Sequence, residues 1–426
     1  MAYFPSQRIA DALAKAGIGL WVEALQHGRI AIVAKIPETV IKALHRGAKA
    51  SLFIGVMPGD SLRFLCLGLR VNDEPSHPFT LTMSSVSPED SVLLRTILNT
   101  GSATLHCINE LDHPVLSAWC KLTPSVARKA GEALGSSDHW LLTPDSGARI
   151  APSEISRKLD LAQTRFEEWI FGSRVLSSNG PAATLPVEIP LALDFWPRQT
   201  VIHLSPTLEE AFSIDDEAEG EKLERAVLSV VELLYPERAY RSPRIPEGTG
   251  TRELTDVLGF NDDWLCVIQA KALSVLGVAD GRSSERRTSA VTKDITKGLK
   301  QLAGAMRKIR GSVPIYDAGG TPINIPDRNA PAHGIVLVSE MYSFVDWRAV
   351  AVASSDASEK AHMTLIHVFD LRELVSIANS SGATDRFNES LMQRWALVKK
   401  KGTAYVRARP RNAADPPPEE DWSQDK

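Results

Sequence analysis

The chain has 426 residues, of which 43% are hydrophobic and 23% charged, and its formal net charge is −4. This length provides for two or three domains, and the composition excludes a fibrous or wholly disordered protein. The net negative charge argues against attraction of the whole molecule to nucleic acid, so such a role requires a local basic surface. The longest apolar stretch, residues 265–279, is interrupted by Gln269 and Lys271 and falls short of the roughly 20 apolar residues of a membrane helix, so we expect no membrane partner.

The start of the chain lacks a basic segment followed by an apolar core, which argues against a secretory signal peptide; residues 6–16 instead predict a short amphipathic helix. The cysteines lie far apart with no C-x-x-C pair, so neither a disulfide framework nor a structural zinc site is predicted. They are Cys66, Cys107, Cys120 and Cys266. We expect reduced, buried thiols and a cytoplasmic location.

Residues 1–172 predict an N-terminal α+β domain. Apolar runs separated by Gly, Pro and Asp turn signals predict strands at residues 28–36, 50–57, 62–71, 78–83 and 103–108. Helical periodicity and capping signals predict helices at residues 88–99, 123–134 and 152–172. The role of this domain stays open among recognition of a modified base, a DNA structure, a phage product or a partner protein.

Residues 173–192 are rich in Ser, Gly, Ala and Pro and lack helical periodicity, which predicts a linker. A second domain is then expected over residues 193–406, and its first helix over residues 221–235, where apolar residues share one face. Residues 407–426 contain three consecutive prolines and a cluster of acids, and they predict a disordered tail.

Two apolar runs of the second domain, residues 252–258 and 264–271, flank the turn-forming sequence at 261–263, which predicts a β-hairpin. A turn centred on residues 262 and 263 pairs positions 258 with 267 and 256 with 269. Residues two apart on a strand point to the same side. The hairpin therefore brings a carboxylate, an amide and an amine together on one face: Asp256, Gln269 and Lys271.

This trio suits phosphodiester hydrolysis, because oxygen ligands can hold Mg²⁺ or Mn²⁺ and an ammonium can orient a water molecule. Asp256 with the Q-A-K sequence at residues 269–271 resembles the PD-(D/E)xK nuclease superfamily, and the Gln in place of Glu is most similar to the Mrr-type restriction endonucleases. The resemblance spans roughly residues 219–338. It implies a restriction-endonuclease-like α-β-β-β-α-β domain with a mixed central sheet, and therefore an α/β fold, and it implies an endonuclease dependent on Mg²⁺ or Mn²⁺.

The resemblance implies a role for each site residue. The metal ligands would be Asp256, Gln269 and the backbone carbonyl of Ala270, Lys271 would orient the attacking water, and either Glu221 or Glu224 in the preceding helix would add an acid. The chain departs from the pattern at Thr255, where the motif has Pro, and at Gln269, whose neutral amide binds Mg²⁺ more weakly than a carboxylate. Glu253 could compensate for this weaker ligand, but it lies an odd number of residues from Asp256, so a regular strand would turn it to the opposite side.

A basic segment follows the hairpin. Residues 281–310 hold nine Lys or Arg against two acids, and a helix is predicted over residues 290–309 with three lysines on one face. Such a stripe suits sequence-independent contact with phosphates, with DNA the expected nucleic acid over RNA. The expected nucleic-acid-binding residues are Arg282, Arg286, Arg287, Lys293, Lys297, Lys300 and Gln301. Later segments predict a small hairpin at 313–325, strands at 333–339 and 363–369, and a helix at 370–379.

Two interpretations remain. One is an endonuclease acting in restriction or phage defence, with a possible homodimer because cutting both strands usually takes two sites. The other is a catalytically silent nuclease-fold module that binds nucleic acid or assists assembly, in which Gln269 marks the loss of strong metal binding. At the level of residues alone, Gln269 and Lys271 could also cover a solvated hairpin face, and the basic stripe could be a solvated helix face.

Overall fold

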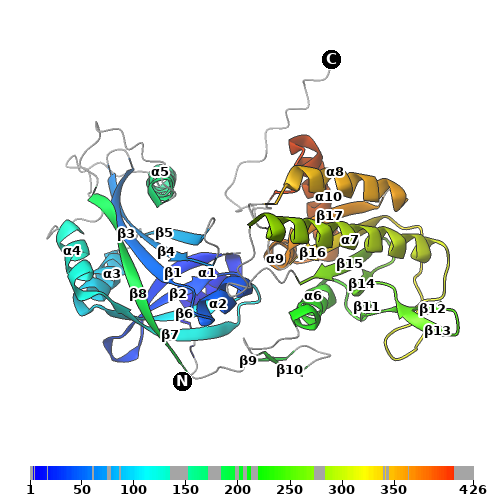
Figure 1. Ribbon diagram of the computed structural model, residues 1–426, viewed down its shortest axis with the longest axis horizontal. Coiled ribbons are helices and arrows are strands. Elements are labelled where there is room, and N and C mark those ends of the chain that lie inside the picture. The colour runs from blue at the N-terminus through cyan, green and yellow to red at the C-terminus, as the bar shows by residue number, and fades with distance from the viewer. Residues whose placement is uncertain are drawn as a thin grey trace, which may run out of the picture.

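The computed structural model describes residues 3, 5–16, 18–59, 62–73, 78–85, 88–134, 152–170, 184–196, 201–204, 209–212, 219–272, 284–338, 341, 345–362 and 364–406. The chain is an α/β protein with two large β-sheets, each surrounded by its own helices (Figure 1). The predicted tail at residues 407–426 lies outside the described residues.

The N-terminal sheet has eight strands in the order β1-β2-β6-β7-β8-β3-β4-β5. Their bounds are β1 Gly19–Ala24, β2 Ile30–Lys35, β3 Ala50–Gly59, β4 Leu62–Val71, β5 Phe79–Ser85, β6 Ser102–Ile108, β7 Pro114–Leu122 and β8 Thr184–Phe195. All neighbours are antiparallel except β2 and β6. The five strands predicted here are confirmed, whereas β1, β7 and β8 were missed.

The helices of this unit are α1 Gln7–Lys15, α2 Glu38–His45, α3 Pro88–Thr100, α4 Pro124–Leu134 and α5 Pro152–Ile170, with a 3-10 turn, η1, at Gln26–Gly28. The predicted helices near residues 6–16, 88–99, 123–134 and 152–172 are therefore confirmed. Ser6 begins α1 as its N-cap, because its side chain accepts a hydrogen bond from the backbone N–H of Ile9.

The linker predicted over residues 173–192 is wrong for residues 184–192, which lie in β8, while residues 173–183 lie outside the described part of the chain. β8 pairs with β7 on one side and β3 on the other, so the N-terminal sheet extends beyond residue 192 to Phe195. Its apolar residues alternate with period two, which is the strand signal that the Pro and Ala content obscured. They are Val187, Ile189, Leu191, Leu193 and Phe195. A separate pair of strands, β9 Val201–Leu204 and β10 Glu209–Phe212, follows.

The second sheet has the order β11-β14-β15-β16-β17. Its strands are β11 Ala239–Arg241, β14 Val257–Phe260, β15 Leu265–Lys271, β16 Ala332–Val338 and β17 Leu365–Asp370. The pairs from β11 to β15 are antiparallel and those from β15 to β17 are parallel, so the sheet is mixed. With α6 Glu219–Leu234 before β11 and α7 Ser284–Arg310 between β15 and β16, the predicted α-β-β-β-α-β order is confirmed.

Further elements surround this order. A two-stranded hairpin, β12 Arg244–Glu247 and β13 Gly250–Glu253, is inserted between β11 and β14 and projects beside one end of α7 (Figure 1). α8 Trp347–Lys360, α9 Leu371–Ser381 and α10 Thr384–Lys401 complete the unit. The hairpin predicted at 313–325 is reduced to one antiparallel bridge between Tyr316 and Pro322, and Tyr316 also bridges Arg244.

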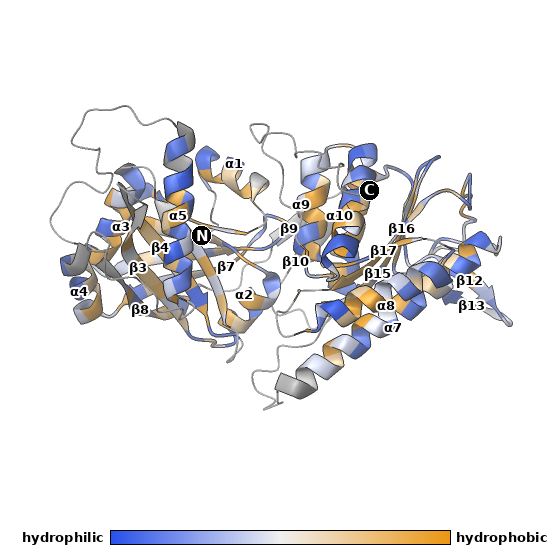
Figure 2. Cartoon of the chain, turned by 90° about the horizontal axis from the view of Figure 1, so that it is seen from above, coloured by the Kyte–Doolittle hydropathy of each residue, from blue (hydrophilic) through white to orange (hydrophobic). Residues whose placement is uncertain are grey.

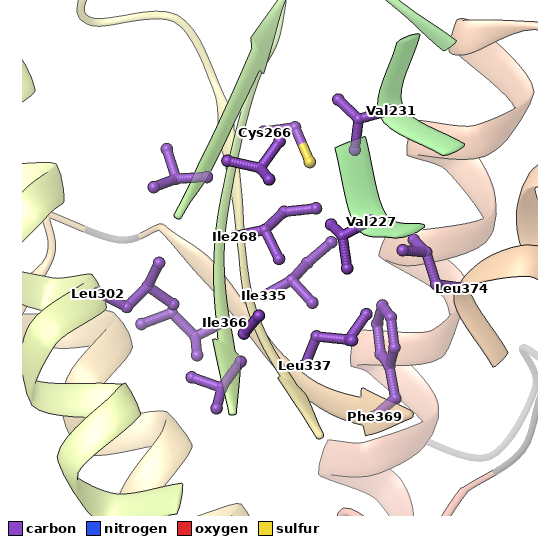
Figure 3. Packing of buried hydrophobic residues seen from close by; sticks show 14 of the residues in the cluster. Val227, Val231, Cys266, Ile268, Leu302, Ile335, Leu337, Ile366, Phe369 and Leu374 are labelled. Carbon is purple, nitrogen blue, oxygen red and sulfur yellow. The ribbon is translucent and has the colours of Figure 1, made fainter. Parts of the chain in front are cut away.

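Helices pack on both faces of the second sheet. Figure 3 shows Leu302 of α7 on one side of the strands, and Val227 and Val231 of α6 with Leu374 of α9 on the other. Apolar residues recur along α7 at helical spacing and are buried: Val291, Ile295, Leu299, Leu302, Met306 and Ile309. The hydrophilic residues of α7 lie away from this stripe, as the colours of Figure 2 show. α7 therefore presents an apolar face to the sheet and leaves a polar face uncovered.

A buried ion pair joins the two units. Lys222 Nζ of α6 lies 2.8 Å from Glu38 Oε1 of α2, and the Lys222 side chain is only 6% exposed. The same Glu38 oxygen lies 3.3 Å from Lys42 Nζ, and Asn109 Nδ2 donates to the other Glu38 oxygen. The Glu110 carboxylate accepts from the Glu38 backbone N–H. α6 is thus held by the N-terminal unit on one side and by its own sheet on the other.

Candidate active site

The predicted hairpin register is confirmed. Val257 pairs with Ile268 and Leu258 with Val267, as a turn centred on residues 262 and 263 requires. Asp256 immediately precedes β14 and lies opposite Gln269. Gln269 Nε2 donates to Asp256 Oδ1 at 2.5 Å, and the backbone N–H of Ala270 donates to Asp256 Oδ2 at 2.6 Å.

Asp256 is held as a buried acid, with its residue 6% exposed. Burial, followed by a side-chain hydrogen bond with Glu253, raises the pKa of Asp256 from 3.8 to about 7, against the opposing attraction of Lys271. Burial and the neighbouring Glu253 carboxyl therefore both favour the neutral form of Asp256. A carboxyl group with a pKa near 7 can change its charge near neutral pH.

Lys271 ends β15 beside α7. A Cβ atom on Gly298 would lie 3.4 Å from Lys271 Cε and 2.9 Å from Val336 Cγ1. The absence of a side chain at Gly298 therefore leaves room for the aliphatic part of the Lys271 side chain. Burial lowers the pKa of Lys271, and Lys297 adds to this effect, while Asp256 and Glu224 oppose it. The amine is therefore easier to deprotonate than a surface lysine.

The structure distinguishes the two helix glutamates. Glu224 lines the cavity that contains Asp256 and Lys271. Burial and then the charge of Asp256 raise its pKa. Glu221 lies outside this cavity and forms ion pairs with Arg225 at 3.0 Å and Arg241 at 3.2 Å. Of the two candidates, Glu224 is the acid that α6 brings to the site.

Glu253 also lines the cavity, and the expectation that it faces the opposite side is wrong. β13 ends at Glu253 and β14 begins at Val257, so the intervening residues are not in a regular strand and the alternation of sides does not hold across them. Thr255 is turned inward instead, where its hydroxyl donates to the Ile268 carbonyl at 2.7 Å. The sequence signal that could have located Glu253 is the interruption of the apolar strand pattern before Val257.

The site opens into a cavity of about 500 Å³. The cavity is lined by Glu224, Arg252, Glu253, Leu254, Thr255, Asp256, Gln269, Lys271, Lys300, Gln301, Gly304, Ala305 and Lys308. Acids therefore lie next to Lys271, and cations from β13 and α7 lie around them. Arg252 and Lys308 belong to this set and were not predicted, since neither falls within the predicted lysine stripe.

The predicted nucleic-acid-binding residues divide into three groups. Lys300 and Gln301 line the cavity. Lys293 and Lys297 are exposed on α7 without lining it. Arg286 and Arg287 lie in the first turn of α7, and Arg282 lies outside the described residues. The stripe therefore runs along α7 and reaches the site at Lys300.

The donor set suits a hard divalent cation, which prefers carboxylate, amide and backbone carbonyl oxygens. Gln269 Nε2 donates a hydrogen bond to Asp256, and no described residue donates a hydrogen bond to Gln269 Oε1. The Ala270 N–H points toward Asp256. Because the N–H and C=O of one strand residue point to the same side, the Ala270 carbonyl also points toward Asp256. Among the described residues, no three Asp, Glu, His or Cys side chains gather closely enough to hold a metal. A metal here needs the neutral oxygens and water as well.

No family model, curated protein or solved structure matches the chain. The described helices include none with the length and apolar content that crossing a bilayer requires. The four cysteines are buried thiols, as predicted, and none lines the cavity. The interpretation of the site therefore depends on its own geometry.

Proposed function

We propose that the chain is a metal-dependent endonuclease of the PD-(D/E)xK superfamily that hydrolyses phosphodiester bonds of DNA. The observation that carries this proposal is the meeting of Asp256, Gln269 and Lys271 on one face of a mixed sheet, in a cavity that Glu224 also lines. The order of strands and helices around them is the one that the resemblance implies.

Each residue has a distinct task. Asp256 binds the cation together with the Gln269 amide oxygen and the Ala270 carbonyl, and Glu224 adds negative charge. A bound Mg²⁺ or Mn²⁺ polarises the phosphoryl group and makes a bound water more acidic. Burial makes the Lys271 amine less basic, and this amine holds the attacking water in line. Lys300 and Lys308 neutralise the phosphates on either side of the scissile bond.

Cleavage of supercoiled plasmid, linear duplex, single-stranded DNA and RNA with Mg²⁺ or Mn²⁺ tests the proposal. Wild type should cut DNA, and Asp256→Asn and Lys271→Ala should lose this activity while remaining folded. Glu221→Gln is the matched control, because Glu221 lies on the same helix as Glu224 but outside the cavity. If Asp256→Asn and Lys271→Ala both cut as wild type does, the site is assigned wrongly.

The second candidate is a catalytically silent module that binds nucleic acid. Two observations favour it: the neutral Gln269 at the metal position, and the absence of three metal-binding side chains close together among the described residues. Binding of DNA that is weakened by salt but indifferent to a chelator, with no cleavage on any substrate, would support this module over the enzyme.

The resemblance to Mrr-type enzymes extends the proposal to restriction or antiviral defence in the cytoplasm. A homodimer would supply the two sites that cutting both strands requires. Sedimentation with and without duplex DNA tests this, and a monomer in both conditions that nevertheless cuts duplexes in one event would overturn it.

A further inference from the structure

The β12–β13 hairpin contributes almost nothing to the core of the second unit. Every residue of β13 is exposed, and in β12 only Ile245, with 1% of its surface exposed, is buried. A two-stranded ribbon without a covered face is only marginally stable in water. Figure 1 shows the ribbon projecting away from the second sheet. The hairpin is therefore a protrusion that core packing does not explain.

The base of the hairpin is nevertheless firmly held. Ile245 packs in the main core of the second unit. The Arg244 N–H donates to the Tyr316 carbonyl at 2.7 Å, and the Tyr316 N–H donates to the Arg244 carbonyl at 2.8 Å. After β13, the Leu254 N–H donates to the Pro243 carbonyl at 2.8 Å. These bonds fix the direction of the ribbon and leave its outer residues available to a partner.

The hairpin also forms one wall of the candidate active site. Arg252 of β13 lines the cavity, as do Lys300 and Lys308 of α7. The residues after β13 lead directly to Asp256 at the start of β14. A phosphodiester held at Asp256 would therefore have α7 on one side and the hairpin on the other.

The two walls carry different chemistry. The charged residues of α7 that line the cavity are both lysines, which suit phosphates as point charges. The hairpin instead exposes donors and acceptors together, on Thr251, Arg252 and Glu247. Arg252 Nε lies 3.2 Å from Glu247 Oε1, so this ion pair crosses the ribbon. Base edges in the major groove present both donors and acceptors, which Arg, Glu and Thr side chains can match. The hairpin therefore suits base edges, and α7 suits the phosphate backbone.

We propose that the β12–β13 hairpin enters the major groove of duplex DNA beside the scissile phosphate and determines base preference there, with Arg252 as the residue that contacts a base. This inference rests on the proposed function, because it takes DNA as the substrate. The major groove admits a two-stranded ribbon and is about 8.5 Å deep, and strands of four residues span about 13 Å, which reaches the base edges. Glu247 is a positioning residue, because its carboxylate orients the Arg252 guanidinium.

Selection from a library of randomised duplexes tests this inference independently of cleavage. Wild type and each variant bind the library in the presence of a chelator, and the bound duplexes are sequenced. Arg252→Lys keeps the charge but not the planar guanidinium, so preference at one base position should fall by about 5- to 150-fold. Glu247→Gln should weaken preference at the same position.

Two further variants separate base contact from general attraction. Lys308→Ala should weaken binding of all sequences alike, as loss of a phosphate contact does. Arg238→Lys is the matched control, since Arg238 is exposed outside the cavity, and its base preference should equal that of wild type.

A wild-type preference that Arg252→Lys leaves unchanged, or no preference among duplexes, would overturn the inference. Cleavage with Mg²⁺ or Mn²⁺, measured in parallel, reports on the proposed function separately. If wild type cuts DNA but shows no base preference that depends on Arg252, the role of the hairpin is refuted and the nuclease stands. If wild type cuts nothing but its base preference depends on Arg252, the hairpin contact is supported and the catalytically silent module replaces the enzyme.

Discussion

Gln269 Nε2 donates to Asp256 Oδ1 across the β14–β15 pair, so the amide cannot turn over without losing that bond. The orientation of the Gln269 side chain is therefore set by Asp256, and Gln269 lines the cavity beside it. Replacing either residue changes the other, because removal of Asp256 frees the amide to rotate. The effects of single substitutions at these two positions will not add.

Asp256→Asn should stabilise the metal-free protein at alkaline pH. The unfolded chain ionises this carboxyl above about pH 4, but the folded chain keeps its proton until the pKa of about 7. The folded state therefore loses stability as the pH rises from about 4 to about 7. Asp256→Asn has no carboxyl to ionise there, so its stability does not fall in this range. A pKa raised from 3.8 to about 7 corresponds to about 4 kcal/mol, so we expect a gain of that order near pH 8 and none near pH 4.

Urea unfolding of both proteins across this range measures the difference. The control is Asp263→Asn, at an exposed turn position outside the cavity, which should follow wild type at every pH. Parallel curves for wild type and Asp256→Asn would contradict a raised pKa at Asp256.

The hairpin could be predicted because its determinants are local. The turn at residues 261–263 sets the register, and strand alternation then places Gln269 and Lys271 on one face. The choice between Glu221 and Glu224 could not be made locally. The two positions are three residues apart on a helix and share a face, so the choice depends on Arg241, which β11 brings in from elsewhere in the chain.

Two other features escaped prediction for different reasons. Glu253 was assigned to the wrong side because the alternation rule was applied across residues 254–256, where the chain leaves the strand. β8 was missed because Pro186 and Pro190 suggest a loop, although Pro190 pairs with Ser51 within the sheet. The first error arose where the chain leaves the strand before Val257, and the second arose because the proline content was given more weight than the period-two alternation of β8.

Gly304 offers a way to close the cavity without disturbing the core. It lines the cavity, and a Cβ atom there would meet no atom within 4 Å. Gly304→Ala should stabilise α7 by up to about 1 kcal/mol and keep activity, because Gly disfavours a helix interior. Gly304→Leu should fold equally well but lose cleavage. Gly131→Leu on α4, also in open space, is the control and should cut normally.

Lys300 and Lys308 should each contribute one phosphate contact. Anisotropy titrations of labelled DNA at several salt concentrations report this number. Each Lys→Ala change should lower the slope of log affinity against log salt by about 0.9 on a duplex or about 0.7 on a single strand. Arg307→Ala is the matched control, since Arg307 is exposed on the same helix but lies outside the cavity. An equal loss for Arg307→Ala would indicate diffuse attraction.

The buried pair of Arg394 and Glu373 should be a main support of the C-terminal helices. Arg394 Nε lies 2.8 Å from Glu373 Oε1, with both side chains 1% exposed, and the guanidinium also donates to the Val368, Ala404 and Val406 carbonyls. Glu373→Ala should lower the free energy of unfolding by about 3–5 kcal/mol, because it leaves a buried charge unpaired. Thermal unfolding measures the loss, and the exposed Arg386→Ala should show none.

The pair of Glu38 and Lys222 invites a double-mutant cycle. Each single change, Glu38→Gln or Lys222→Met, should destabilise the protein, and the double variant should lose less than their sum, with a coupling of about 0.5–3 kcal/mol. Denaturant unfolding supplies the four free energies. Strict additivity would mean that the two units are held together elsewhere.

Lys222 and Glu224 lie two positions apart in the sequence, or about 200° around the axis of α6. One side chain is anchored in the N-terminal unit while the other faces the cavity. Because one face of α6 is held by the N-terminal unit, the helix cannot rotate about its axis independently of that unit. α6 therefore couples the positions of the two sheets. A rotation of Lys222 with the N-terminal unit would therefore turn the Glu224 carboxylate about the α6 axis by the same angle.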